Sequence, residues 1–285
     1  METTNYHHHH HHHSCREHER RKRMRKLRRL LVQLVIVVVA AVAFYVIYHL
    51  YMNPEWLLGK AGRTAVKLEN GVVVRKESTP HTRLDYNGID VSHHQGDIDW
   101  QKLREDTCVK FVYLKATEGA EIVDGSYLDN VVGARRAGIP VGSYHYLTSG
   151  STVEEQFENF YSVVNRHHQD IVPVVDVEEE GVRGWTKAEA RMNLLKMLRL
   201  IEEHYHCTPI IYSYSHFYNL TLAPEFNEYP LFLSRYEDAE PTVKGAGRHV
   251  IWQHTDQGTV NGINMPVDLD LFAPGITLDN IRMPR

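Results

Sequence analysis

The stretch VPVVDVE, residues 172–178, joins a short apolar run to two acids, and the interpretation of the fold depends on it. A run of four to eight apolar, β-branched residues is typical of a buried strand. Side chains at i and i+2 of a strand share a face, so Asp176 and Glu178 point one way and the adjacent valines the other. A face packed against helices would reject two acids, whereas the polar mouth of a barrel accepts them. The stretch therefore predicts a buried strand with carboxyl groups at its end.

Seven similar runs flank this one, with helical patterns between several of them. The runs cover residues 88–92, 111–117, 141–147, 209–214, 231–236, 250–254 and 267–272, and the helical patterns cover 127–137, 152–166 and 186–205. This alternation predicts an α/β fold, an irregular (β/α) TIM-like barrel. The gaps shrink after Tyr214, so we expect an irregular second half. A doubly wound open sheet is the alternative, although no run is followed by the Gly-rich phosphate loop that would normally accompany it.

Length, charge and cysteine content exclude several classes of protein. The 285 residues, of which 42% are hydrophobic, allow one large barrel or two domains and exclude a disulfide-stapled mini-protein. Residues 1–29 carry nine Lys/Arg against three Asp/Glu, which leaves 23 basic and 33 acidic residues elsewhere. That balance argues against a nucleic-acid partner.

Cys108 and Cys207 each precede an apolar run, so we expect buried free thiols, with a bridge between them as the alternative. The histidine run at 7–13 is typical of a tag or a low-complexity tail.

The N-terminal region predicts a membrane anchor. Residues 30–48, LLVQLVIVVVAAVAFYVIY, carry no formal charge over 19 positions, which is enough to span a bilayer core of about 30 Å at about 1.5 Å per residue. RRKRMRKLRR at 20–29 precedes the run, so the positive-inside rule keeps the N-terminus cytoplasmic. We therefore predict a basic cytoplasmic tail (1–29), a transmembrane anchor (30–52), a stalk (53–84) and the barrel (85–285) on the periplasmic or extracellular side. A cleaved signal peptide is the alternative, but no small-x-small cleavage site follows.

Acids from distant runs would meet if the barrel closes. Asp90 lies in the first run, and Asp268 and Asp270 lie in the last. Crowding carboxyl groups raises the pKa of at least one of them, and a protonated acid beside an ionised one is the minimum needed to cleave a glycosidic bond. Two alternatives stay open at this point: acids that cap helices or bind surface arginines, and acids that hold calcium or magnesium.

Aromatic residues near the ends of the same runs supply flat faces and phenol hydroxyl groups suited to sugar rings. Each one alone is as typical of core packing, but as a set around acids they predict a glycan-binding groove. The set consists of Tyr144, Tyr146, Tyr212, Tyr214, Tyr236 and Trp252.

The chain resembles glycoside hydrolase family 25, the Chalaropsis-type lysozymes, over about residues 86–272. The blocks that carry the resemblance occur in order: GIDVSHHQGDIDW (88–100), FVYLKATEG (111–119), ARRAGIPVGSYHYL (134–147), EEQFENF (154–160), PVVDVEE (173–179), PIIYSY (209–214), LSRY (233–236), IWQHTDQGTVNGI (251–263) and VDLDLF (267–272). Nine blocks in register are far more specific than any single motif.

The resemblance implies a muramidase that cleaves the β-1,4 bond between N-acetylmuramic acid and N-acetylglucosamine in peptidoglycan. Glu178 matches the general acid, Asp176 the residue that assists the 2-acetamido group, and Asp90 and Asp268 the first and last active-site aspartates. Asp270 departs from the family pattern, which often has Asn there, and we group it with the substrate-binding residues. No cofactor or metal is implied, glycan strands are the partner, and we expect a monomer.

The resemblance and the residues leave the stereochemical route and two other functions open. Retention through the substrate's own acetamide is the expected route. Inversion would instead place two carboxyl groups about 6.5–9.5 Å apart, against about 5–5.5 Å for direct attack. The other functions are a module that binds peptidoglycan without cutting it and a hydrolase of chitin-like polymers. Tethering on a stalk favours wall remodelling near the membrane.

Overall fold

The computed structural model describes residues 66–69, 72–75 and 85–284, and the chain forms two compact units, Met1–Ser78 and Thr79–Arg285. In the first unit β1 (Val66–Glu69) and β2 (Val72–Arg75) pair as an antiparallel ladder. The sequence predicted an irregular stalk here, because two four-residue strands are too short to show a clear period. The predicted cytoplasmic tail and membrane anchor lie outside the described residues. Among the residues that are described, no helix is both long and apolar enough to cross a bilayer.

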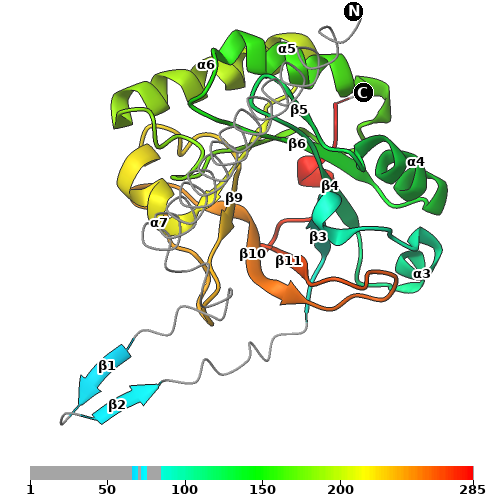
Figure 1. The fold of residues 1–285 in the computed structure, drawn as a ribbon, viewed down its shortest axis with the longest axis horizontal. Helices are drawn as coiled ribbons and strands as arrows, with labels where there is room; N and C mark the ends of the chain where they lie inside the picture. The colour runs from blue at the N-terminus through cyan, green and yellow to red at the C-terminus, as the bar shows by residue number, and fades with distance from the viewer. Residues whose placement is uncertain (1–65, 70–71, 76–84, 285) are drawn as a thin grey trace, which may run out of the picture. The chain divides into compact units, whose positions relative to one another are not determined.

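The second unit contains a closed eight-stranded barrel, as the strand–helix alternation predicted (Figure 1). Closure is achieved by β3, which pairs with β4 on one side and with β11 on the other. Each of the eight runs in the sequence supplies one strand. In order around the barrel these are β3 (Gly88–Val91), β4 (Phe111–Glu118), β6 (Val141–Tyr146), β7 (Val174–Asp176), β8 (Ile210–Tyr214), β9 (Leu231–Ser234), β10 (His249–Gly258) and β11 (Val267–Phe272).

Strand direction determines which residues reach the same end of the barrel. Neighbouring strands from β3 round to β10 are parallel, whereas β11 is antiparallel to both β10 and β3. The carboxyl ends of seven strands and the beginning of β11 therefore share one rim. The chain enters the barrel at the opposite end, before Gly88. It returns to that end after β11, where Val172 N–H donates to the Ile281 carbonyl and Ile171 bridges Arg282.

Helices surround the barrel (Figure 1). Helices α5 and α6 begin at capping boxes, in which Thr152 pairs with Glu155 and Thr186 with Glu189, and α4 ends at Gly138 with a φ of 73°. Residues 235–248, between β9 and β10, hold no helix, as expected for an irregular second half. The helices are α3 (Trp100–Glu105), α4 (Tyr127–Ala137), α5 (Val153–Val163), α6 (Lys187–Tyr205) and α7 (Ser215–Phe217). Short elements are β5 (Ile122–Val123), η1 (His93–Gln95), η2 (Arg166–His168), the π-turn η3 (Tyr218–Leu222) and η4 (Leu278–Ile281).

An aromatic floor fills the barrel beneath the rim. Tyr113 contacts Phe111 edge-on at 5.7 Å between ring centroids and lies 6.1 Å from Phe232. Gly142 makes room for this packing, because an added Cβ there would lie 2.3 Å from the Tyr113 ring. Polar groups above the floor therefore face little water from below, which disfavours their charged forms.

The cysteines follow the prediction in part. Both described cysteines are free thiols, and Cys207 is buried as expected. Cys108 is exposed, contrary to prediction, because it lies in the turn before β4 rather than in the strand itself.

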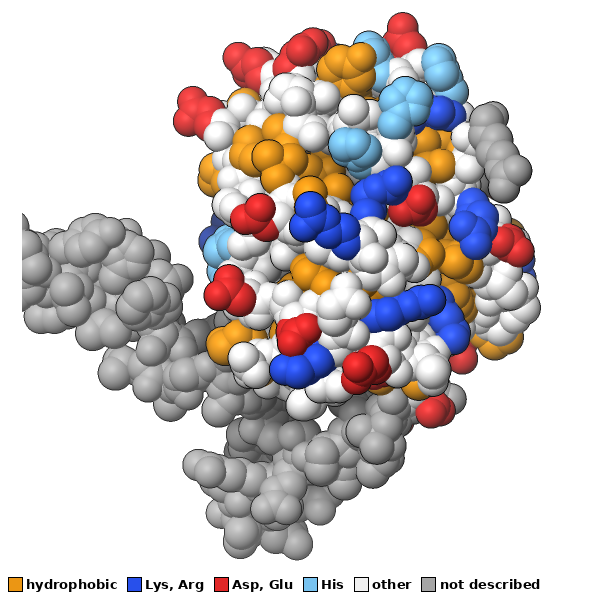
Figure 2. Space-filling view, turned by 90° about the vertical axis from the view of Figure 1, so that its right-hand side faces the viewer, with side chains coloured by type: hydrophobic (Ala, Val, Ile, Leu, Met, Phe, Trp, Pro, Cys, Tyr) orange, Lys and Arg blue, Asp and Glu red, His pale blue; other side chains and the backbone are white. Residues whose placement is uncertain are grey.

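Outside the barrel, the face shown in Figure 2 mixes acidic, basic and apolar side chains, in contrast to the acidic set inside the rim.

Candidate active site

Four acids from three strands lie at the rim. Asp268 near the beginning of β11 lies opposite Asp90 near the end of β3 in the strand register. Asp176 ends β7 between two tyrosine-bearing neighbouring strands, and Glu178 follows it two residues later. Val175 and Val177, on the other face of this strand, are completely buried. Asp176 and Glu178 therefore share the inner face, as the two-residue period predicted.

Burial and mutual repulsion raise the pKa values of these acids. Burial above all, with Glu180 and Asp90 adding to it, raises the pKa of Glu178 to about 7. Burial followed by the charges of Glu178 and Asp90 raises the pKa of Asp176 well above its usual range. Asp90 is half-buried, and its removal from water raises its pKa to about 6, in opposition to the hydrogen bond from Gln253. Each of the three is within electrostatic range of another, so protons are retained in this cluster at neutral pH.

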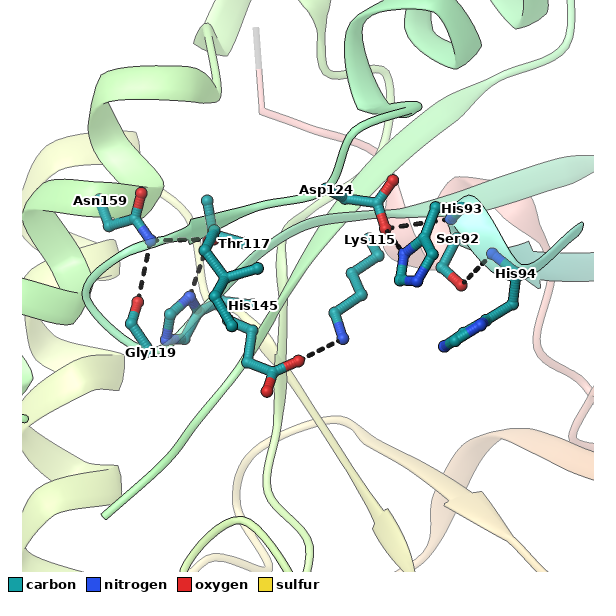
Figure 3. A network of polar contacts seen from close by, with 11 residues as sticks. Ser92, His93, His94, Lys115, Thr117, Gly119, Asp124, His145 and Asn159 are labelled. Carbon is teal, nitrogen blue, oxygen red and sulfur yellow. Dashed lines mark hydrogen bonds and ion pairs between the residues drawn. The ribbon is translucent and has the colours of Figure 1, made fainter. Parts of the chain in front are cut away.

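Lys115 places one positive charge beside the acids. Its ammonium lies 2.6 Å from Glu118, the ion pair drawn as a dashed line from Lys115 in Figure 3. It also lies 5.2 Å from the centroid of the Tyr146 ring. In the register of β4 and β6, Lys115 lies opposite Tyr144 and Glu118 lies opposite Tyr146. A bulge in β4 between Lys115 and Thr117 shifts this register. The bulge brings residues three positions apart onto one face. Lys115 lowers the pKa of both Asp176 and Glu178, in opposition to burial.

Gln253 on β10 connects the acids to the tyrosines. Its side-chain nitrogen donates to Asp90 Oδ2 at 2.7 Å, and its oxygen accepts from the hydroxyl groups of Tyr212 and Tyr236 at 2.8 Å each. Sequence reasoning missed Gln253 and Lys115. The available signal was a polar residue within each largely apolar run, and alternation alone did not identify its partner on a distant strand.

Five of the predicted aromatic residues surround the acids. The charges of Asp90 and Asp176 raise the pKa values of Tyr144 and Tyr212, Glu178 raises those of Tyr146 and Tyr214, and Asp268 raises that of Tyr236, in each case after burial as the main cause. Tyr214 and Tyr236 meet edge-on at 5.8 Å between ring centroids, and Tyr214 is 41% exposed. These phenols line the rim as neutral hydroxyl groups.

Two predicted substrate-binding residues lie away from the rim surface. Trp252 precedes Gln253, so it points to the outer face of β10, where it is 2% exposed and its indole N–H donates to the Arg235 carbonyl at 2.9 Å. Asp270 is completely buried, because β11 is antiparallel and each later residue lies further from the rim. Neither side chain is available to contact a glycan, and both predictions are corrected on this ground.

A second polar pair lies just beyond β3. His93 Nδ1 lies 2.7 Å from Asp124 Oδ2, and the same oxygen accepts from the His93 backbone N–H (Figure 3). The carboxylate fixes the ring and the first turn after β3. Over residues 85–284, no group of three His, Cys, Asp or Glu side chains has the arrangement of a metal site.

This geometry can be compared with known proteins. The family model for glycosyl hydrolases family 25 matches residues 89–263, which is more than half of the chain. The chain belongs to glycosyl hydrolase family 25. It is therefore a glycoside hydrolase, and the match spans β3 to β10 with Asp90, Asp176, Glu178 and Gln253 inside it.

This glycosyl hydrolase is similar to several bacterial proteins. The protein YegX of Escherichia coli K12 is 37% identical over 190 residues, covering 65% of this chain and 69% of its own. The autolytic lysozyme of Clostridium acetobutylicum is 33% identical over 189 residues, covering 66% of this chain and 56% of its own. Among solved structures, the bacterial lysozyme from Streptomyces coelicolor is similar with a TM-score of 0.62 and 26% identity, over 67% of this chain and 93% of that one.

Proposed function

We propose that this glycoside hydrolase is a peptidoglycan muramidase that cleaves the β-1,4 bond between N-acetylmuramic acid and N-acetylglucosamine. The observation that carries the proposal is the pair Asp176 and Glu178 at the rim, with Glu178 holding a pKa of about 7. A carboxyl group with this pKa is protonated in a large fraction of molecules at neutral pH and can still release its proton. The names of the lysozyme relatives support peptidoglycan as the substrate.

Glu178 is the general acid in this proposal. Its carboxyl donates a proton to the leaving O4 oxygen as the glycosidic bond breaks, and the resulting carboxylate then accepts a proton from the attacking water. Lys115 limits how far burial raises the pKa of Glu178, so the acid remains strong enough to give up its proton.

Asp176 assists the 2-acetamido group. Its Oδ1 is buried and receives no hydrogen bond from the protein. An acetamide N–H is a donor of the right kind, and a carboxyl group that accepts it holds the acetamide oxygen toward the anomeric carbon. This arrangement favours retention through an oxazoline-like intermediate, whose positive charge Asp176 stabilises by accepting the hydrogen bond of its N–H group.

Asp90 and Asp268 complete the acidic side of the groove, and the five rim tyrosines complete its glycan-binding side. Tyr214 is the most exposed large aromatic residue among them, so it is the natural surface for a pyranose ring to stack on. Tyr212 and Tyr236 both donate to Gln253, which fixes their rings before a glycan binds.

We also propose that residues 30–52 anchor the enzyme in a membrane, with the barrel on the periplasmic or extracellular side. The support is the uncharged 19-residue run behind a basic segment. A carbonate-washed membrane fraction should retain the full chain. Recovery of a protein that begins after Tyr51 in the medium would contradict the anchor.

The function is tested by digesting purified peptidoglycan and chitin side by side with the full chain. Mass spectrometry of the released fragments should identify N-acetylmuramic acid at the new reducing ends. New N-acetylglucosamine ends, or release from chitin alone, would replace the muramidase assignment by another glycosidase. Binding without any released fragment would indicate a module that only binds the glycan.

A further inference from the structure

Asp270 is a buried acid that the proposed mechanism leaves unused. It is completely enclosed and lies between Gln253 on β10 and Gly88 on β3 in the strand register, one step below the Asp90–Asp268 pair. The ring of Phe111 closes this position, since an added Cβ on Gly88 would lie 2.2 Å from it. Water and glycan are therefore kept away from the Asp270 carboxyl.

The groups that face Asp270 offer it no positive charge. Asp90 faces it from β3, Asp268 from its own strand and Tyr113 from β4. Gln253 faces it from β10, but the Gln253 amide already donates to Asp90 and accepts from two tyrosines. None of these facing groups in the described part of the chain is a cation, so an ionised Asp270 would be a buried, uncompensated charge.

Asp90 and Asp270 are diagonal neighbours on the inner face of β3 and β11, and neither oxygen of Asp270 receives a hydrogen bond from a protein donor. Two carboxylates only accept, so Asp270 can bond to Asp90 only if one member of the pair carries a proton. Gln253 donates to Asp90 and thereby favours its anion. Burial and the Asp90 charge both raise the pKa of Asp270. The shared proton therefore resides on Asp270.

We propose that Asp270 is a neutral carboxylic acid at neutral pH and that its hydroxyl group donates to Asp90, which it holds as an oriented anion at the rim. Asp270 is then a positioning residue, because it acts through Asp90 and does not touch the glycan. As far as activity is concerned, this inference rests on the proposed muramidase function. The position of the proton does not depend on it.

An amide at position 270 could take over the donor role of the acid. An Asn amide donates through N–H, and a protonated Asp donates through O–H, so both satisfy Asp90 from below. Only the acid can lose its donor, which happens when it ionises. The chain therefore tolerates an acid at this position as long as the proton remains.

Infrared spectroscopy of the full chain at pH 7 tests the position of the proton directly. Protonated carboxylic acids have a C=O stretching band that is separate from the bands of ionised carboxylates. The measurement uses a Glu178→Gln background, which removes one competing acid. Adding Asp270→Asn should remove one protonated-acid band, whereas the control Asp279→Asn, a surface carboxylate paired with Arg282, should remove none. An unchanged band after Asp270→Asn would overturn the proposal.

Activity of the single variants tests the positioning role. Asp270→Asn keeps a donor and should retain most of the wild-type kcat/KM, whereas Asp270→Leu, of similar volume but without a donor, should lose about tenfold or more, as expected for a lost hydrogen bond to a charged group. Equal activity of the two variants would overturn the role, and thermal unfolding shows whether the leucine variant is folded. A wild type that releases no fragments would instead overturn the proposed function, while the infrared band still decides where the proton is.

Discussion

Asp90 accepts a 2.7 Å hydrogen bond from Gln253, a residue 163 positions further along the chain. Strand β11 lies between the two strands that carry them, so the bond requires that both strands pair with β11. Gln253 also accepts from two tyrosines of β8 and of the segment after β9. The orientation of Asp90 is thereby linked to Tyr212 and Tyr236, which we propose to bind glycan.

Replacing Glu178 by Gln should abolish the acid step. We expect kcat/KM on peptidoglycan to fall by about 10²–10⁴-fold, the usual contribution of a positioned general acid. Glu179→Gln is the matched control, because Glu179 is adjacent but exposed, and it should keep full activity. Release of reducing ends measures both. Equal activity of the two variants would assign the acid role to another residue.

The alkaline limit of activity should follow the pKa of Glu178. The acid must be protonated to act, so kcat/KM should decline as pH rises through about 7. Glu180→Gln removes a charge that raises this pKa and should move the decline to lower pH. Lys115→Met removes a charge that lowers it and should move the decline to higher pH. Shifts of the same sign in both variants would contradict the electrostatic account.

The same pKa predicts how stability depends on pH. Glu178 has a folded-state pKa of about 7, above its ordinary value of 4.5. Its contribution to stability is therefore complete below about 4.5 and is lost as pH rises through 7. Glu178→Gln should gain up to about 3 kcal/mol in unfolding free energy, relative to wild type, between pH 4 and pH 8.

The control is a variant whose stability relative to wild type should change with pH in the opposite direction. The capping-box carboxyl Glu189 has its pKa lowered by hydrogen bonds from the Thr186 backbone and side chain. Its contribution is present above its unfolded pKa and is lost as pH falls through the folded one. Glu189→Gln should therefore lose stability relative to wild type as pH rises. Urea denaturation at several pH values measures the unfolding free energy of both variants. If both change with pH in the same direction, the raised pKa of Glu178 is refuted.

Removing the Gln253 side chain should damage both stability and catalysis. Gln253→Leu leaves the hydroxyl groups of Tyr212 and Tyr236 without this acceptor and removes the Gln253 donor from Asp90. We expect a loss of about 1–3 kcal/mol in unfolding free energy, together with a lower kcat/KM. Gln257→Leu on the same strand, at an exposed position, is the control. Normal activity of the Gln253 variant would show that Asp90 is held by other contacts.

Trp252 should affect stability alone. Trp252→Phe removes the bond to the Arg235 carbonyl and part of a buried ring, which should cost about 1–3 kcal/mol in unfolding free energy. The KM for peptidoglycan should stay unchanged. Tyr214→Ala, at the exposed rim position, should instead raise KM. An increase of KM in the Trp252 variant would return that residue to the glycan-binding set.

The sequence predicted the elements of the barrel better than the relations between them. All eight strand runs and the helix at 127–137 are confirmed, because each has a strong local period. Helix α3 was missed, since six residues give no helical period of their own.

The site shows the same division between local pattern and tertiary structure. The inward pair Asp176 and Glu178 followed from the two-residue period. The depth of Asp270 depends on the reversed direction of β11, and the pairing of Lys115 with Glu118 depends on a bulge. Trp252 was misplaced because an aromatic residue at a strand end looks the same on either face. The direction of a strand, its bulges and the face on which a side chain lies all depend on the neighbouring strands. The sequence of one run alone therefore does not reveal them.

Strand β11 returns the chain to the end of the barrel at which β3 begins, so the catalytic unit starts and finishes on the side away from the rim. A carrier protein fused to either end of the catalytic unit, or a bead coupled through one, is therefore attached at the end of the barrel opposite the rim. Immobilised enzyme should digest long glycan strands as readily as free enzyme, since the support does not occupy their path.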